Sequence, residues 1–97
     1  MNNLTPNQIH DAKVFYRFFN RIPEEKWCRN YFFMGNQRCV LGHLGVITRS
    51  DLNPSAQKLI SLFRAYDRRD PADINNSTFN MPKQNILNHL KKMFSST

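Results

Sequence analysis

Two cysteines and a nearby histidine are the residues of this sequence best suited to chemistry. Cys39 and His43 stand four positions apart, so on a helix both side chains would face the same side. A zinc ion held there could also recruit Cys28 and one of His10 or His89. Structural zinc sites usually pair their cysteines at short spacing, however, and ten residues separate Cys28 from Cys39. We therefore predict no metal and interpret both thiols as small buried side chains.

The same residues could instead serve a cysteine enzyme, with Cys39 or Cys28 as nucleophile and His43 as its base. Such chemistry needs a thiol of lowered pKa beside a positioned base. Arg38 would favour the thiolate of Cys39, but the apolar residues that follow indicate burial, which raises the pKa of a thiol. We therefore expect no catalytic residue and no cofactor, and keep a cysteine-dependent enzyme as a third hypothesis.

Three aspartates recur at every third position in a polar segment, and oxygen-rich loops of this kind can hold Ca²⁺ or Mg²⁺. They are Asp67, Asp70 and Asp73. Arg68 and Arg69 lie between the first two and would neutralise a cation site. We interpret the aspartates as turn and cap residues.

Fourteen Lys and Arg against seven Asp and Glu give the chain a formal net charge of +7. Such an excess favours an anionic partner, namely nucleic acid, a nucleotide or an acidic protein surface, although it can also serve solubility alone. If the helices that carry the cations are neighbours, one patch suited to phosphate would form, because arginine donates two hydrogen bonds at once. The candidate binding residues are Lys13, Arg17, Arg21, Arg64, Arg68 and Arg69.

Proline placement predicts where the helices that position these residues begin. Thr5-Pro6-Asn7-Gln8 has the form of a capping box and precedes an amphipathic helix over roughly 6–21. Asn53-Pro54 repeats the cap before a helix over 55–67. Pro23 favours a short helix, and Pro82 opens the last one.

The remaining segments predict a hairpin, a buried helix and a connection. Residues 31–39 place aromatic side chains around a turn with Gly35 or Asn36 at positive φ, which favours a short β-hairpin. Residues 39–46 are apolar on nearly every side and predict a central buried helix, on which Cys39, Gly42 and Gly45 would let Trp27 approach closely. Residues 68–81 predict a polar connection, held to the body by Ile74 and Phe79.

Together these elements predict a mostly-α fold, a compact single domain of four to five helices over residues 1–97 with a short β-hairpin near 31–39. The ordered core spans 5–94, and the termini fray. No segment approaches the roughly 20 apolar residues of a membrane span, and two cysteines without a signal peptide favour the cytoplasm. We therefore expect no membrane partner. The predicted core residues are Phe15, Phe19, Trp27, Leu41, Leu44, Leu59, Phe63, Ile86 and Leu90.

A series of short motifs runs from Phe18-Phe19 through Pro23-Glu24-Glu25 and Trp27-Cys28 to Cys39-Val40-Leu41-Gly42. This series resembles a family of small bacterial and phage proteins of uncharacterised function. Similar members continue to Ile-Asn-Asp before a last helix that opens with proline, and this chain has Ile74-Asn75-Asn76 before Pro82. The resemblance implies a mostly helical unit with a small hairpin and implies no reaction. Asn76 in place of the usual Asp removes support for a cation-binding or acid–base role at that position.

The leading hypothesis is a non-enzymatic small basic binding protein that engages a phosphate-bearing or nucleic-acid partner through an Arg/Lys helix face. The alternative is a protein-interaction module with an acidic partner. In line with the resemblance, such a module would be phage-encoded and would bind a host factor. A helix-turn-helix over 39–64 is a weaker variant of the first hypothesis, because its second helix presents few side chains that read bases. The oligomeric state is left open.

Overall fold

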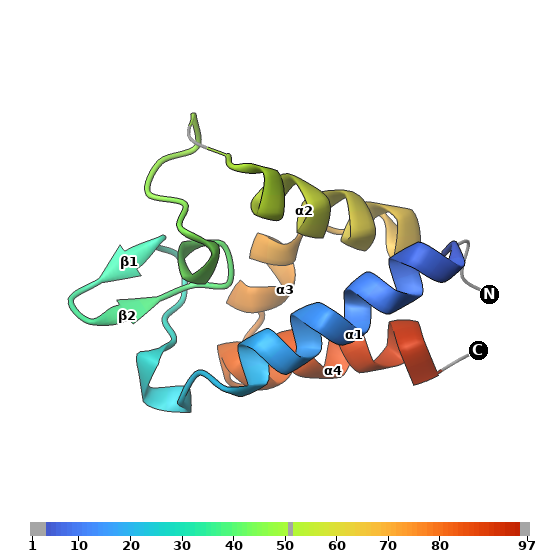
Figure 1. Cartoon of the computed structure of the whole chain (residues 1–97). Helices are drawn as coiled ribbons and strands as arrows, with labels where there is room; N and C mark the ends of the chain where they lie inside the picture. The colour runs from blue at the N-terminus through green and yellow to red at the C-terminus, as the bar shows by residue number, and fades with distance from the viewer. Residues whose placement is uncertain (1–3, 51, 96–97) are drawn as a thin grey trace.

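The computed structural model describes residues 4–50 and 52–95 and confirms the mostly-α fold with a short hairpin. Predicted fraying concerns chiefly residues 1–3 and 96–97, which lie outside the described residues. The molecule measures 38 × 27 × 21 Å along its principal axes. In chain order (Figure 1) its elements are α1 (Pro6–Asn20), η1 (Glu24–Lys26), β1 (Phe33–Met34), β2 (Gln37–Arg38), η2 (Gly42–Leu44), α2 (Pro54–Asp67), α3 (Pro71–Asn76) and α4 (Pro82–Ser95).

The predicted helix caps are present. The Thr5 hydroxyl accepts a hydrogen bond from the Gln8 backbone N–H at 3.1 Å, and the Gln8 side chain accepts one from the Thr5 N–H at 2.9 Å. The Asn53 side chain likewise accepts from Ala56 N–H at 2.9 Å at the start of α2. Such caps satisfy N–H groups that have no partner within the helix, and each stabilises it by about 1 kcal/mol.

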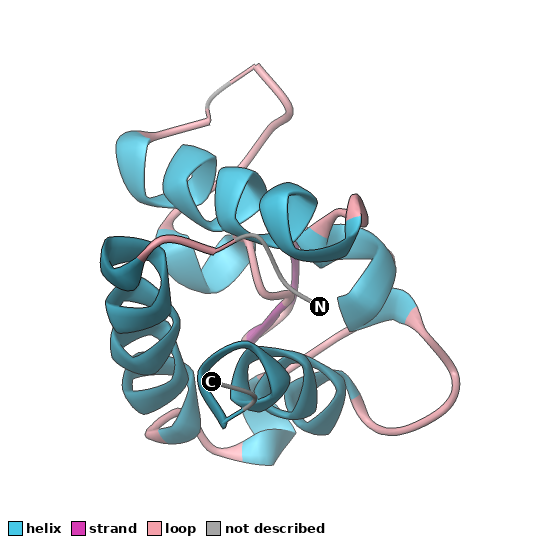
Figure 2. Ribbon diagram, turned by 90° about the vertical axis from the view of Figure 1, so that its right-hand side faces the viewer, coloured by secondary structure: helices cyan, strands magenta, loops and turns pink. Residues whose placement is uncertain are grey.

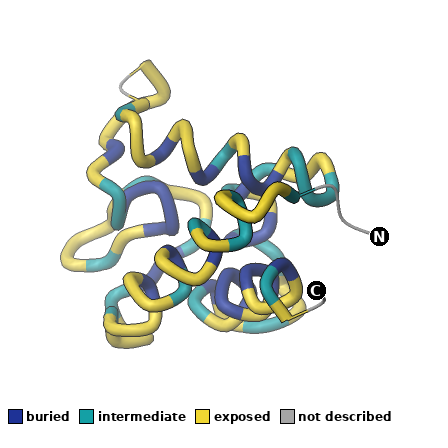
Figure 3. The backbone as a smooth tube through the Cα atoms, turned by 45° about the vertical axis from the view of Figure 1, so that its right-hand side comes forward, coloured by how far each residue is buried: buried dark blue, intermediate teal, exposed yellow. Residues whose placement is uncertain are grey.

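The core lies between the helices, with α1 packed chiefly against α4 and α3 packed against α4. Figure 2 shows the helices surrounding this interior, and in Figure 3 their buried residues recur on the inward side. Phe19 is fully buried, with its ring centroid 6.0 Å from that of Phe15 and 5.6 Å from that of Trp27. Of the predicted core residues only Leu44 is not fully counted in the core, since it is partly buried and packs against its margin.

The hairpin forms as predicted, with β1 antiparallel to β2 in the register Phe33↔Arg38 and Met34↔Gln37. Gly35 occupies the turn at φ 62°, which a residue without Cβ adopts at little cost. Phe33 and Met34 are about half exposed, and the hairpin projects from the side of the molecule (Figure 1).

The prediction of a helix over 39–46 is wrong, because this segment is a tight turn that contains only the 3-10 helix η2. The Cys39 N–H donates to the Phe32 carbonyl at 3.2 Å, and a Cβ on Gly42 would collide with that same carbonyl oxygen. Gly45, at φ 95°, ends the turn. Cys39, Val40, Leu41 and Val46 are nevertheless buried. Gly42 makes room for the Phe32 backbone instead of for Trp27.

The prediction of an irregular connection over 68–81 is also wrong, because residues 71–76 form helix α3. Ile74 is buried as expected. Phe79, expected to anchor the segment, is 88% exposed. Within the described residues, the helices are all too short or too polar to cross a membrane.

Candidate anion-binding groove

A groove with a volume of about 530 Å³ lies between α3, the connection 77–80 and α4. The cations Arg69, Lys91 and Lys92 line it, together with the acidic residue Asp73. The groove also contains hydroxyl and amide side chains, which can both donate and accept hydrogen bonds. These are Ser77, Asn80, Asn85 and Asn88.

Side chains of the distant residue Arg29 and of Asn85 in α4 hold the connection 77–80. The Arg29 guanidinium donates to the carbonyl oxygens of Ser77 and Asn80, at 3.3 and 2.5 Å. The buried Asn85 amide donates to the same two carbonyls at 2.8 and 2.9 Å. The Phe79 N–H donates to the Ser77 hydroxyl at 3.2 Å. The backbone that carries Phe79 is therefore fixed, while the Phe79 ring points into solvent.

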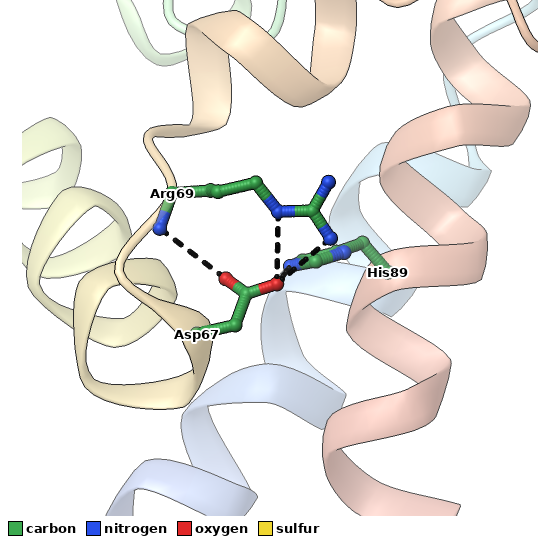
Figure 4. A network of polar contacts seen from close by, with 3 residues as sticks. All are labelled: Asp67, Arg69 and His89. Carbon is green, nitrogen blue, oxygen red and sulfur yellow. Dashed lines mark hydrogen bonds and ion pairs between the residues drawn. The ribbon is translucent and has the colours of Figure 1, made fainter.

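Arg69 and His89, which line the groove, belong to a polar network with Asp67 (Figure 4). The Arg69 guanidinium donates to Asp67 Oδ2 at 3.0 and 3.1 Å, and the Arg69 N–H donates to Asp67 Oδ1 at 3.3 Å. His89 Nε2 lies 3.4 Å from Asp67 Oδ2 but has no hydrogen-bond partner of suitable geometry among the described residues. Burial lowers the pKa of His89, and Asp67 opposes this only in part. His89 is therefore neutral at physiological pH.

Two of the predicted arginines form ion pairs with aspartates. Arg64 donates to Asp70 at 2.6 and 3.3 Å, and Arg69 pairs with Asp67 as described above. Arg68 is exposed and closes α2 in the left-handed conformation at φ 65°. Asp67 has a turn role as predicted, since it accepts from the Arg69 N–H two residues on. Asp70 stands at the N-cap position of α3 but makes no capping hydrogen bond, because its carboxylate pairs with Arg64.

The other predicted cations form an exposed row on α1. Lys13, Arg17 and Arg21 follow one another at four-residue spacing, and within residues 4–50 and 52–95 none of them forms an ion pair. The C-terminal end of α2 overlaps the beginning of α1 in Figure 1, but Figure 2 shows that it lies on the α3 side of the molecule, away from α1. The two predicted groups of cations therefore do not merge into one patch.

Lys91 of α4 extends the α1 row instead. Tyr16 of α1 meets Phe94 of α4 edge-on, with ring centroids 5.4 Å apart. Since the two helices run in opposite directions (Figure 1), Lys91, one turn before Phe94, lies towards the Arg17 side of this ring pair. We call Lys13, Arg17, Arg21 and Lys91 the α1–α4 cationic face.

The two thiols are buried in the core, and His43 is partly buried. Cys28 and Cys39 are each 6% exposed, and burial raises the pKa of Cys28. The His43 ring packs against Trp27 at a tilt of 58°, with ring centroids 4.6 Å apart. Burial, followed by the charge of Arg38, lowers the pKa of His43 to about 4. A protonated thiol beside a weakly basic imidazole is poorly suited to nucleophilic catalysis. Among the described residues, no set of three or more Cys, His, Asp or Glu could bind a metal ion.

The sequence interpretation missed His89, Asn85 and Phe79 as groove residues. His89 continues the spacing of Ile86, Leu90 and Met93, so the helical period places it on the buried side of α4. No protein-family model, curated protein or solved structure matches this chain significantly. The family resemblance of the segment 18–45 therefore stays a prediction.

Proposed function

We propose that this protein is a non-enzymatic nucleic-acid-binding protein that contacts the phosphate backbone through the α1–α4 cationic face. The observation that carries the proposal is the contrast between the two groups of cations. Arg64 and Arg69 are neutralised by aspartates, whereas the side chains of the α1–α4 cationic face form no ion pair within the described residues.

Placing like charges on adjacent helices costs free energy, and a phosphate backbone would offset this cost. Each lysine or arginine that neutralises a phosphate releases a condensed counterion, so binding weakens as salt is added. The exposed row on α1 advances by about 6 Å for each four residues, so its cations are spread along the helix instead of gathered at one point. The buried cysteines and low-pKa His43 support a binding role over a catalytic one.

A salt titration with a fluorescent oligonucleotide tests the proposal. We expect binding at low ionic strength that weakens steeply with salt. The double variant K13Q/R17Q should bind less tightly, and its log–log salt slope should be shallower by about 1.4 for a single strand. The matched control R49Q/K58Q removes the same charge from exposed residues outside the α1–α4 cationic face and should bind almost as wild type. Absence of binding at low salt would refute the proposal.

The projecting hairpin favours protein interaction as a second candidate function. Tyr31, Phe33 and Met34 are 60%, 52% and 49% exposed. Tyr31 and Leu52 also line a groove of about 650 Å³ beside α2 and α3. Clustered exposed apolar side chains often mark protein-binding surfaces. If this function operates, affinity capture from the host extract should recover a defined protein that the variant F33S/M34S loses, while recovery of nucleic acid alone would count against it.

A further inference from the structure

We infer that the groove between the connection 77–80 and α4 receives an unpaired base of a single-stranded nucleic acid, with Phe79 as the stacking surface. This inference rests on the proposed function and narrows it from nucleic acid in general to single strands.

Phe79 is exposed although the fold does not require its ring to be exposed. The ring is 88% exposed, although burial of a phenylalanine side chain generally stabilises a folded protein. The connection does not depend on the ring for its conformation, since Arg29 and Asn85 hold the Ser77 and Asn80 carbonyls. A rigid backbone thus presents an aromatic ring to solvent. Such preorganisation reduces the entropy lost when a ligand binds.

The surroundings of Phe79 match the parts of a nucleotide. Lys91 and Lys92 line the same groove and can attract a phosphate. Asn80 and Asn88 offer amide groups, which can bond the edges of bases. Lys91 also belongs to the α1–α4 cationic face, so a strand that follows this face can continue into the groove. A single ligand would therefore use both the cations and the ring.

The same features distinguish a single strand from a duplex and from a membrane. In a duplex the bases are stacked on one another, so a ring on the protein surface has no free base face to contact. An anionic lipid surface would suit the lysines and the ring, but acyl chains cannot use the amides and hydroxyls that line the groove. An unpaired single strand presents phosphates, base edges and base faces together.

The test compares a short oligothymidylate, the same oligomer with abasic sites, a blunt duplex and anionic vesicles. Wild type should bind the oligothymidylate more tightly than the abasic oligomer or the duplex. Phe79→Ala should weaken binding of the oligothymidylate by at least about fivefold and leave binding of the abasic oligomer unchanged. Phe79→Trp should retain tight binding. Ile47→Ala, which removes another exposed apolar side chain outside the groove, serves as the control.

The outcomes separate this inference from the function on which it rests. If single strand, abasic oligomer and duplex bind equally, and Phe79→Ala has no effect, the base site is refuted and the phosphate-binding function stands. If no nucleic acid binds at low salt, both are refuted. Binding to vesicles alone, lost in Phe79→Ala, would also refute both and identify a membrane surface as the ligand. Because Phe79 is exposed, its variants should melt like the wild type.

Discussion

Among single residues, Asn75 joins more segments than any feature of the sequence suggested. Its side chain is fully buried, accepts a hydrogen bond from Val40 N–H at 3.0 Å and donates to the Cys28 carbonyl at 3.0 Å. It also donates to Asn76 Oδ1, which accepts from Asn30 N–H. Asn75 thus ties α3 to both sides of the cysteine-bearing segment. In the proposed family resemblance, Ile74-Asn75-Asn76 then has a structural role.

Replacing Asn75 by alanine should lower the free energy of unfolding by about 3 kcal/mol, because it leaves a buried N–H and a buried carbonyl without partners. Urea denaturation followed by circular dichroism measures this change. Asn88→Ala is the control, since Asn88 is exposed on α4 and should shift the free energy by less than about 0.5 kcal/mol. Equal stability of the two variants would contradict the assigned role of Asn75.

His43 and His89 should make the fold sensitive to acid. Burial lowers the pKa of both, that of His43 to about 4, whereas in the unfolded chain both titrate near about 6.5. As pH falls below about 6.5, the unfolded state therefore binds protons that the folded state rejects.

The free energy of unfolding should accordingly fall between about pH 6.5 and pH 5, by at most about 1.4 kcal/mol per pH unit for each histidine. Urea midpoints across this range measure the slope. In His43→Gln the slope should be shallower, because one of the two groups no longer titrates. Stability that rises on acidification would show that the folded state holds these imidazoles protonated.

At the scale of elements, the turn 39–46 depends on Gly42. A Cβ at this position would collide with the Phe32 carbonyl oxygen, and rigid backbone cannot move aside as a side chain can. Gly42→Ala should therefore cost at least about 3 kcal/mol. Gly35→Ala at the hairpin tip meets no atom within 4 Å and should cost only about 1 kcal/mol, owing to its positive φ. Thermal unfolding of both variants compares them, and a milder effect at Gly42 would exclude this close approach.

The same turn shows which elements the sequence could reveal. Helices α1, α2 and α4 combine a capping signal or leading proline with a long apolar period, so their starts were predictable from local residues. The turn 39–46 is apolar throughout, and such a run does not distinguish a helix from a buried turn. Only the long-range contact of Gly42 with Phe32 distinguishes the buried turn from a helix. Helix α3 has six residues, and its buried Asn75 gives no hydrophobic signal.

The candidate binding residues also differ in how far the sequence could predict their environment. The exposed row on α1 could be derived from helical spacing, because it needs no tertiary contact. The neutralisation of Arg64 by Asp70 and of Arg69 by Asp67 depends on how the chain turns after α2. The connection that carries Phe79 is bonded by Arg29, which lies 50 residues before Phe79 in the chain. A local sequence pattern cannot predict a contact between residues so far apart in the chain.

For the whole molecule, the structure separates an enclosed cysteine-bearing core from a charged exterior. Cys28 and Cys39 lie where the hairpin, η2 and α3 meet, tied together through Asn75. If the domain unfolds as one unit, a thiol reagent can reach these sulfurs only while the whole domain is unfolded. The rate of labelling then reports the stability of the whole fold.

We therefore expect both native thiols to react slowly with a disulfide reagent, at a rate set by the unfolding equilibrium, and an engineered Ser61→Cys on the exposed face of α2 to react at once. Asn75→Ala should accelerate labelling of Cys28 and Cys39 roughly a hundredfold, because about 3 kcal/mol of stability corresponds to that factor. Mass spectrometry of the labelled protein follows each thiol separately. Rapid labelling of Cys39 in the fully folded wild type would instead show an accessible thiol, and would move the cysteine-dependent enzyme ahead of the binding protein.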